Sequence, residues 1–300
     1  IKECEEVSDA RVTSIDLGTG LAAAVLDLPR ALFYHTLSQQ SGFQIQDDGD
    51  LVSLLTQLAG VKAAYDKVAD ALKEVEETGY GIVVDKVTKN QYASEHIWNY
   101  MRNKKTCGII SEDRAFGVKK IASPKGVIAA ITPTTNPTST TIYKIMLALK
   151  TRNAIILSPH PHAVNCSIAA AKIMRDAAIE AGLPEHVISW ISIPSLEISD
   201  VLMKSVDLII ATGGSGMVKA AYSSGTPAIG VGPGNCNVVI DETADLRMAV
   251  ESIIHSKTFD NGMICASEQH ITVLASVYDE VKRLLKEARC YFLNDEEAAK

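Results

Sequence analysis

The chain has 300 residues, a formal net charge of −7, and a composition that is 47% hydrophobic and 22% charged. These values are typical of a soluble globular protein with room for two domains. The acidic charge argues against a general nucleic-acid-binding protein, which would carry a basic patch or stripe. The longest apolar run, residues 17–26, is too short to span a bilayer, so we expect no membrane partner.

Six cysteines are spread along the chain without a Cys-x-x-Cys pair, which argues against a zinc site or a dense disulfide framework. Free thiols suit a reducing compartment. The acidic N-terminus, with Glu3, Glu5 and Glu6, differs from a signal or transit peptide. Together these features predict a cytoplasmic location.

Residues 1–46 carry no pattern that assigns them to a domain. Within them, the apolar spacing over residues 21–37 is that of a helix broken by a proline. Apolar side chains recur at helical spacing over residues 47–77, and a second helix is predicted over residues 88–101.

From residue 126 onward, short apolar runs alternate with amphipathic helical runs. This alternation predicts a parallel sheet covered on both faces, which is a doubly wound, Rossmann-type α/β fold. The predicted strands are residues 126–131, 153–157, 187–191, 207–211 and 237–240, and the predicted helices are residues 140–149, 163–181, 195–204 and 217–223.

A further helix is predicted over residues 244–255, followed by a segment that contains Cys265 and by a β-type run, residues 269–274. Residues 276–279, SVYD, form a capping-box pattern that predicts the start of another helix.

The loops that follow the predicted strands lie where ligands bind in sheets of this type. In the first, residues 131–140, Pro133 and Pro137 bracket Asn136. A rigid carboxamide there can donate a hydrogen bond to an oxyanion. The alternative is an Asx-type turn that caps the following helix.

The second loop, residues 211–217, has the sequence ATGGSGM and opens a helix. Its glycines let main-chain N–H groups approach a phosphate, which the helix dipole favours. It matches neither a Walker A sequence nor a first-turn G-x-G-x-x-G pattern. The third loop, residues 228–235, has three glycines within five residues, which suit either a ligand or a tight crossover between domains.

His160 and His162 would share a face of an extended segment, a spacing that can hold a metal. No cluster of Cys, His, Asp or Glu in the sequence completes such a site. We therefore expect no metal, and we expect both histidines at a cofactor rim or in solvent.

Cys265 lies between an Asn-Gly turn and the predicted strand after it. A thiol that a turn holds beside a strand can face a cleft and act as a nucleophile. The alternative is a small buried core residue, as free cysteines commonly are.

Taken in order, these segments resemble the aldehyde dehydrogenase superfamily. The resemblance is greatest to its CoA-acylating branch, specifically the aldehyde dehydrogenase half of bifunctional aldehyde–alcohol dehydrogenases. It covers the chain from about residue 50 to the C-terminus. The resembling segments are residues 77–81, 105–108, 133–140 (PTTNPTST), 149–156, 158–161, 211–225 (ATGGSGMVKAAYSSG), 227–232, 239–245 and 256–269 (SKTFDNGMICASEQ).

The resemblance implies a dinucleotide-binding domain with N-terminal helices over residues 47–240. Residues 241–300 are then the start of a second α/β domain, catalytic and truncated, that carries the nucleophile Cys265. Asn136 falls at the side-chain oxyanion donor, which works with the main-chain N–H of Cys265. The positions implied to bind the dinucleotide are Thr134, Ser158, Pro159, His160, Thr212, Gly213, Gly214, Ser215, Val231 and Gly232.

The implied reaction begins with attack of Cys265 on an aldehyde and passes hydride to a nicotinamide, which leaves a thioester on the cysteine. Hydrolytic relatives activate water with a glutamate, and Val231 occupies the place of that glutamate. Valine cannot accept a proton, so the thioester should survive until a coenzyme A thiol attacks it. Glu268 is expected to be a structural or solvated carboxylate rather than a substitute base.

Ser158 stands where hydrolytic relatives carry a lysine that binds the adenosine ribose, so we expect NAD, with NADP left open. The family's catalytic domain continues well beyond its cysteine, so the chain is expected to be part of a longer polypeptide.

The expected function is therefore a CoA-acylating aldehyde dehydrogenase that acts on a short aldehyde, acetaldehyde first, in a homo-oligomer. One alternative is a non-catalytic assembly piece in a filament or an enzyme-packed compartment. Another alternative is a hydrolytic semialdehyde dehydrogenase.

Overall fold

The computed structural model describes residues 11–16, 22–27 and 67–298. The chain divides into two compact units, residues 1–232 and residues 233–300, and the division lies before the boundary that the sequence predicts after residue 240. Most of the predicted helix over residues 47–77 lies outside the described residues; its described part is α5 (Lys67–Thr78).

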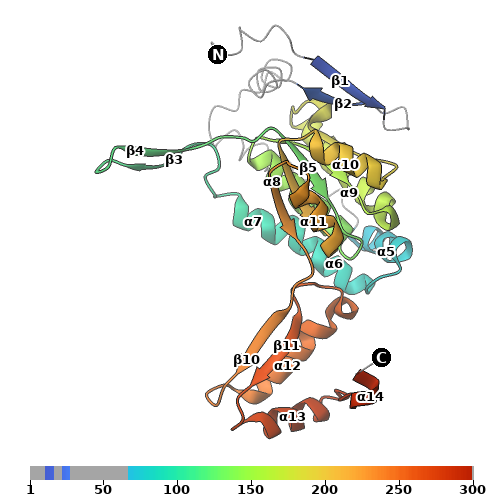
Figure 1. The fold of residues 1–300 in the computed structure, drawn as a ribbon, viewed down its shortest axis with the longest axis vertical. Coiled ribbons are helices and arrows are strands. Elements are labelled where there is room, and N and C mark those ends of the chain that lie inside the picture. Colours follow the sequence, from blue (N-terminus) through green and yellow to red (C-terminus); the bar gives the residue numbers. More distant parts are fainter. Residues whose placement is uncertain (1–10, 17–21, 28–66, 299–300) are drawn as a thin grey trace. The chain divides into compact units, whose positions relative to one another are not determined.

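A five-stranded parallel sheet forms the centre of the first unit, with the strand order β7-β6-β5-β8-β9 (Figure 1). The strands are β5 (Val127–Ile131), β6 (Ala154–Ser158), β7 (Ile188–Trp190), β8 (Leu208–Thr212) and β9 (Ala228–Val231). The first four confirm predicted strands. The glycine-rich segment after residue 227 was expected to be a loop, and its first part forms the edge strand β9 instead.

Helices cover both faces of this sheet, as the alternation in the sequence predicts. Successive residues of β5 point to opposite faces: Ile128 and Ala130 pack with α8 and α9, and Ala129 and Ile131 pack with α10 and α11. The covering helices are α8 (Pro137–Lys150), α9 (Val164–Glu180), α10 (Leu196–Lys204) and α11 (Ser215–Ser223). The doubly wound α/β fold is confirmed.

The helix predicted over residues 88–101 begins earlier. It consists of α6 (Val83–Gln91), a π-helical turn (Tyr92–His96) and α7 (Ile97–Met101). An antiparallel hairpin of β3 (Gly108–Asp113) and β4 (Val118–Ala122) follows, and the sequence did not predict it. All six residues of β3 are exposed, so the strand lacks the half-buried alternation that identifies strands.

The second unit is a β-α-β arrangement with its own core. β10 (Cys236–Ile240) pairs in parallel with β11 (Glu268–Val273), and α12 (Leu246–Thr258) connects them. β10 was expected in the central sheet, and this expectation is wrong because its hydrogen bonds go to β11. Ile240 packs with Val250 and Ile253 of α12.

The helix predicted after residue 276 is confirmed as α13 (Tyr278–Glu287), and α14 (Asp295–Ala298) follows it. The predicted capping box is wrong. Val277 takes the N-cap position, so Ser276 lies one residue too early for its hydroxyl to cap the helix.

Near the N-terminus, β1 (Arg11–Asp16) pairs antiparallel with β2 (Ala22–Asp27). The helix expected over residues 21–37 is therefore wrong over β2. A run of six apolar residues does not distinguish helix from strand by periodicity, and pairing with β1 decides it. The rest of that segment lies outside the described residues. Among the described residues, no helix is long and apolar enough to cross a membrane.

Candidate active site

The carboxyl ends of four neighbouring strands meet at one edge of the central sheet. Ile131 of β5 pairs with Ser158 of β6 on one side and with Ala211 of β8 on the other. Thr212 pairs in turn with Val231 of β9. The chain leaves β5 toward β6 and returns to β8 on the opposite side, so the gap between β5 and β8 is a topological switch point, where ligands bind in such folds.

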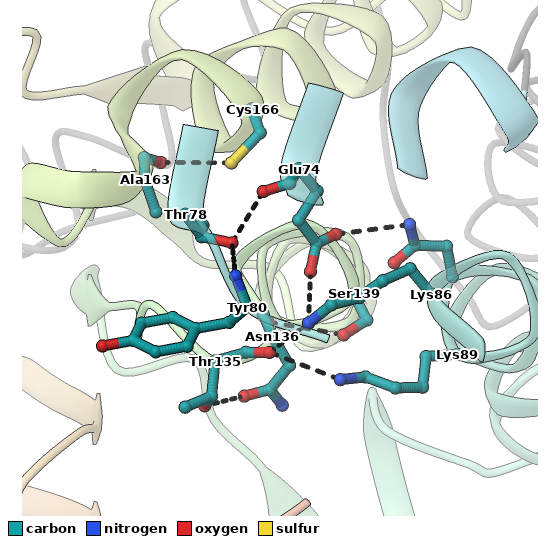
Figure 2. Close-up of polar contacts among 11 residues, drawn as sticks. Glu74, Thr78, Tyr80, Lys86, Lys89, Thr135, Asn136, Ser139, Ala163 and Cys166 are labelled. Atoms are coloured by element: carbon teal, nitrogen blue, oxygen red, sulfur yellow. Dashed lines mark hydrogen bonds and ion pairs between the residues drawn. The ribbon is translucent and has the colours of Figure 1, made fainter. Parts of the chain in front are cut away.

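The loop after β5 presents Asn136 at the start of α8. Its carboxamide oxygen accepts a hydrogen bond of 2.8 Å from the hydroxyl of Thr135, and its carbonyl oxygen accepts one of 3.2 Å from the N–H of Thr140. The side chain makes no capping bond to α8, which excludes the Asx-cap alternative; Pro137 in the first turn favours the helix start instead. Among the described residues, the amide nitrogen of Asn136 has no hydrogen-bond partner (Figure 2).

Buried hydroxyl groups without a hydrogen-bond partner in the described structure gather around the same loop. They belong to Thr132, Thr134, Thr138 and Thr141. A buried polar group without a partner is costly, so such groups commonly mark a place where a polar ligand or water binds. This loop therefore fits a polar cofactor at the switch point, and it includes Thr134 from the predicted set.

The glycine loop after β8 leads directly into α11. Gly214 is the N-cap residue, and a Cβ atom added at Gly214 or Gly216 would meet nothing within 4 Å. The open end of the helix can hold a phosphate through its first N–H groups. The N–H of Gly213 donates instead to the carbonyl of Val231 at 3.1 Å, so Gly213 holds the loop against β9.

β9 packs tightly under α11. A Cβ atom at Gly230 would lie 2.7 Å from Val218 and 2.9 Å from the ring of Tyr222, so only glycine fits there. The Tyr222 hydroxyl also accepts a hydrogen bond of 2.9 Å from the Gly230 N–H. Val231 and Gly232 follow at the ligand edge, and the Val231 side chain is 47% exposed, so it can be reached from solvent.

Ser158, Pro159 and His160 lie at the carboxyl end of β6, in the same row of strand ends. Ser158 is buried. His160 Nδ1 accepts a hydrogen bond of 3.1 Å from the N–H of His162. Partial burial and the neighbouring His162 lower the pKa of His160. The described residues hold no group of three or more metal-ligating side chains.

Cys265 lies in the second unit, between a tight turn and β11. The turn contains three successive residues with positive φ: Asp260 at 52°, Asn261 at 55° and Gly262 at 72°. Aspartate, asparagine and glycine tolerate this left-handed conformation, which explains why the chain reverses here. Cys265 is exposed, which excludes the alternative of a buried core thiol.

The other described cysteines are less accessible than Cys265. Cys107 and Cys166 are buried, and burial together with the carboxylate of Glu77 raises the pKa of Cys166 far above its ordinary value. Cys236 is half-buried, and its thiol donates a long hydrogen bond of 3.7 Å to the main-chain carbonyl of Cys265. Of the cysteines that the structure describes, Cys265 is therefore the most accessible thiol.

Glu268 begins β11, three residues after Cys265. A hydrogen bond from Ser256, with a smaller contribution from Lys257, lowers the pKa of Glu268, so it is a weak base. This environment supports the interpretation of Glu268 as a structural carboxylate.

The structure also identifies residues near the site that the sequence did not single out. Lys86 and Glu74 are fully buried and form an ion pair of 3.0 Å beside the Asn136 loop (Figure 2). Lys144 is buried in α8 and donates to the carbonyls of Ile131 and Ile210, at 2.6 and 2.9 Å. The sequence could have indicated Lys86 and Lys144 only through their position, because each is a lysine on the apolar face of its helix.

Comparison with known proteins gives two family matches. Residues 63–293 match the model of the aldehyde dehydrogenase family. Residues 1–97 match the model of the stage IV sporulation protein A middle domain, so the two matches overlap over residues 63–97.

The chain is similar to aldehyde-alcohol dehydrogenases. It is 54% identical over 248 residues to the bifunctional aldehyde-alcohol dehydrogenase AdhE of Escherichia coli K12, which covers 82% of this chain and 28% of that protein. It is 51% identical over 251 residues to the enzyme of Clostridium acetobutylicum, covering 84% of this chain and 29% of that protein.

A solved structure of an acetylating aldehyde dehydrogenase from Geobacillus thermoglucosidasius has 45% identity and a TM-score of 0.79, covering 89% of this chain and 59% of that one. The chain thus spans under a third of the curated relatives named above and about three fifths of this solved structure. Because the family model matches most of the chain and the sheet has the matching architecture, the chain belongs to the aldehyde dehydrogenase family.

Proposed function

We propose that the protein carrying this chain is a CoA-acylating aldehyde dehydrogenase. It converts a short aldehyde, a nicotinamide dinucleotide and coenzyme A to the acyl-CoA and the reduced dinucleotide, or runs the reverse reduction. The observation that carries the proposal is an exposed Cys265 after a turn of left-handed residues, and the family resemblance puts Val231 in the place of the base that hydrolytic relatives use. The acetylating relative of known structure supports it.

In this mechanism the thiolate of Cys265 attacks the aldehyde carbon. The amide nitrogen of Asn136 and the main-chain N–H of Cys265 donate hydrogen bonds to the developing oxyanion, which stabilises the charge without adding one. A nicotinamide bound at the strand ends would supply the acceptor for the hydride that leaves the former aldehyde carbon. The acyl group then remains on Cys265 as a thioester.

The second half of the reaction transfers the acyl group to coenzyme A. Val231 cannot take a proton from water, so the thioester is slow to hydrolyse. The thiolate of coenzyme A attacks the thioester carbonyl, the bond to Cys265 breaks, and Cys265 leaves as a thiolate. Thiol exchange of this kind needs no general base in the protein once the attacking thiol is ionised.

The cofactor proposal rests on the row of strand ends. Gly214 and Ser215 at the start of α11 would hold the pyrophosphate, and Ser158, Pro159 and His160 would line the adenosine side. We propose NAD as the cofactor because Ser158 is small and neutral and brings no positive charge for a 2′-phosphate. NADP is the competing cofactor in the test.

The test measures reduction of NAD, and separately of NADP, with acetaldehyde in the presence and absence of coenzyme A. It uses the native polypeptide that carries this chain, its Cys265→Ala variant, and Cys290→Ala as a matched control in the same unit. We expect turnover that requires coenzyme A, yields acetyl-CoA by mass spectrometry, and is lost in Cys265→Ala alone. Turnover without coenzyme A, or activity that survives Cys265→Ala, would refute the proposal.

A second candidate is an assembly role for the polypeptide. The match of residues 1–97 to a model from another family motivates it, as does a structural neighbour at 31% identity and TM-score 0.72. That neighbour is a propionaldehyde dehydrogenase from a Clostridium phytofermentans bacterial microcompartment. Size-exclusion chromatography combined with an NAD-binding assay separates the two. Large assemblies that bind no NAD would favour the assembly role, whereas a small homo-oligomer that binds NAD favours the enzyme.

A further inference from the structure

A buried ion pair lies directly behind the loop that carries Asn136. Glu74 of α5 and Lys86 of α6 are both fully buried, and their charged atoms are 3.0 Å apart. Asn90, one turn after Lys86, donates a hydrogen bond of 3.4 Å to the second carboxylate oxygen of Glu74. Buried charges are costly, and apolar residues often stabilise a fold as well as a buried pair does, so a pair of this kind calls for a more specific explanation.

The ammonium group of Lys86 reaches out of this pair to the active-site loop. It donates a hydrogen bond of 2.5 Å to the main-chain carbonyl of Thr135, and Lys89 approaches the same carbonyl at 3.4 Å. Figure 2 shows both lysines converging on Thr135. The carbonyl belongs to the peptide unit that joins Thr135 to Asn136, so Lys86 fixes the orientation of that peptide plane.

The side chain of Thr135 continues the connection. Its hydroxyl donates a hydrogen bond of 2.8 Å to the carboxamide oxygen of Asn136. Because the carboxamide oxygen accepts this hydrogen bond, the amide nitrogen points away from Thr135. The amide nitrogen is thereby left to donate to another group, as an oxyanion donor must. The side chain of Asn136, the N-cap residue of α8, makes no capping bond to the helix, so the contact with Thr135 sets the direction of the carboxamide.

We propose that Lys86, held by Glu74, is a positioning residue that orients Asn136 through the main-chain carbonyl and hydroxyl of Thr135. The inference rests on the proposed function, because it assigns Asn136 to the oxyanion. It extends that function to two buried residues, on α5 and α6, that the proposed reaction steps do not otherwise use.

The decisive variant is the double change Lys86→Met and Glu74→Gln in the native polypeptide. Replacing Lys86 alone leaves a buried unpaired carboxylate and risks unfolding, whereas the double change removes both charges together. It still deletes the shorter of the two lysine hydrogen bonds to the Thr135 carbonyl and leaves only the longer one from Lys89. Lys150→Met is the control, because Lys150 is also a buried lysine that donates to a main-chain carbonyl, that of Arg102, at 3.3 Å.

We expect the double variant to lower kcat roughly 10- to 100-fold, somewhat less than the loss of a whole oxyanion donor. NAD affinity should stay within about twofold of wild type, since the α11 loop is untouched. The same double change made in an Asn136→Ala background should cost little more, because both act on one group. Lys150→Met should keep the wild-type kcat.

Hydrogen exchange provides a readout that does not depend on activity. Amides of the peptide covering residues 132–138 should exchange faster in the double variant and at the wild-type rate in Lys150→Met. Unchanged exchange there, unchanged kcat, or a loss that adds fully to that of Asn136→Ala would each overturn the inference. If exchange is faster in the double variant but Asn136→Ala is fully active, the contact from Lys86 to the loop is supported. The proposed role of Asn136 as an oxyanion donor is then refuted instead.

Discussion

The carboxylate of Glu77 accepts a hydrogen bond of 2.7 Å from the main-chain N–H of Cys166, in the first turn of α9, and one of 2.8 Å from the neighbouring N–H. Glu77 lies at the end of α5, far from α9 in the sequence. The N-cap residue of α9 makes no side-chain cap bond of its own, so α5 supplies the cap from outside. The negative charge also faces the positive end of the α9 dipole.

Replacing Glu77 with glutamine should destabilise the protein by about 1–2 kcal/mol, because an amide can accept from only one of the two N–H groups and its NH₂ opposes the other. Urea unfolding followed by circular dichroism measures the change. Glu76→Gln is the matched control, since Glu76 is exposed, and it should leave stability within about 0.5 kcal/mol of wild type. Equal effects of the two changes would contradict the capping role.

Gly230→Ala should destabilise by about 1–3 kcal/mol, because the new methyl group would overlap Val218 and Tyr222 and push α11 away from β9. NAD affinity should fall as well, because α11 begins at the phosphate loop. Gly216→Ala is the control for stability: its Cβ enters open space, and alanine favours the helix. Thermal unfolding distinguishes the two, and a neutral Gly230→Ala would refute the tight packing.

Stability should depend on pH through Lys144. Burial lowers the pKa of Lys144 from 10.5 to about 7 in the folded protein. Between these values the unfolded chain binds more protons than the folded one, so the free energy of unfolding should rise with pH from about 7 to about 10. Below pH 7 both states carry the proton, and this contribution no longer changes.

The measurement compares wild type with Lys144→Met by urea unfolding at pH 7 and pH 9.5. The difference between them should grow by one to a few kcal/mol in favour of wild type at the higher pH, at about 1.4 kcal/mol for each pH unit. Lys219→Met, at an exposed position, should show no such change. A pH-independent difference for Lys144→Met would mean that the lysine stays charged when buried.

Introducing a carboxylate at the edge of β9 should convert part of the activity to hydrolysis. Val231 is half-exposed, so Val231→Glu can enter without a new cavity or clash. A general base contributes about 100- to 10,000-fold when well placed, and roughly 10-fold faster CoA-independent release of acid is expected from an unoptimised one. Acetate formation measures this. Val231→Gln has the same size without a base and should show no increase.

Thiol modification should follow accessibility. Iodoacetamide should label Cys265 first, and label Cys107 and Cys166 at least about 100-fold more slowly, because buried thiols react only after local opening. The raised pKa of Cys166 slows it further. Mass spectrometry of digests taken at successive times gives the order in which the cysteines are labelled. Early labelling of Cys166 would show that the first turn of α9 unfolds locally and exposes this thiol.

The central sheet could be predicted from the sequence because β5, β6, β7 and β8 are short apolar runs between amphipathic helices. β9 could not, because Gly230 within it and Gly232 just after it make the segment resemble a loop. The structure explains the glycine in this strand, because Tyr222 and Val218 of α11 pack against Gly230 and leave no space for a side chain. The pairing of β10 with β11 could not be predicted either. The two strands are separated in sequence by α12, and the local pattern of apolar residues does not indicate which strand pairs with which.

The location of the candidate site could be predicted from the sequence, because its motifs follow strands that are neighbours in the sheet. Motifs after β5, β6, β8 and β9 were predicted to bind one cofactor, and register brings all four to one edge. The hydrogen bonds from Lys86 to Thr135 and from Thr135 to Asn136 were not predicted, because Lys86 is far from the other two residues in the sequence. A charged residue at a helix position is also normally taken as solvent-exposed.

The register of Ile131 with Ser158 and Ala211 has a consequence for how this chain can tolerate length changes. Because neighbouring strands end in step, one residue inserted within β5 would turn its later side chains to the opposite faces and carry the Asn136 loop out of line with its neighbours. An insertion in the α9–β7 connection, at the far end of the strands, would leave that edge unchanged. Lineages that diverge in length should therefore do so at the amino ends of these strands.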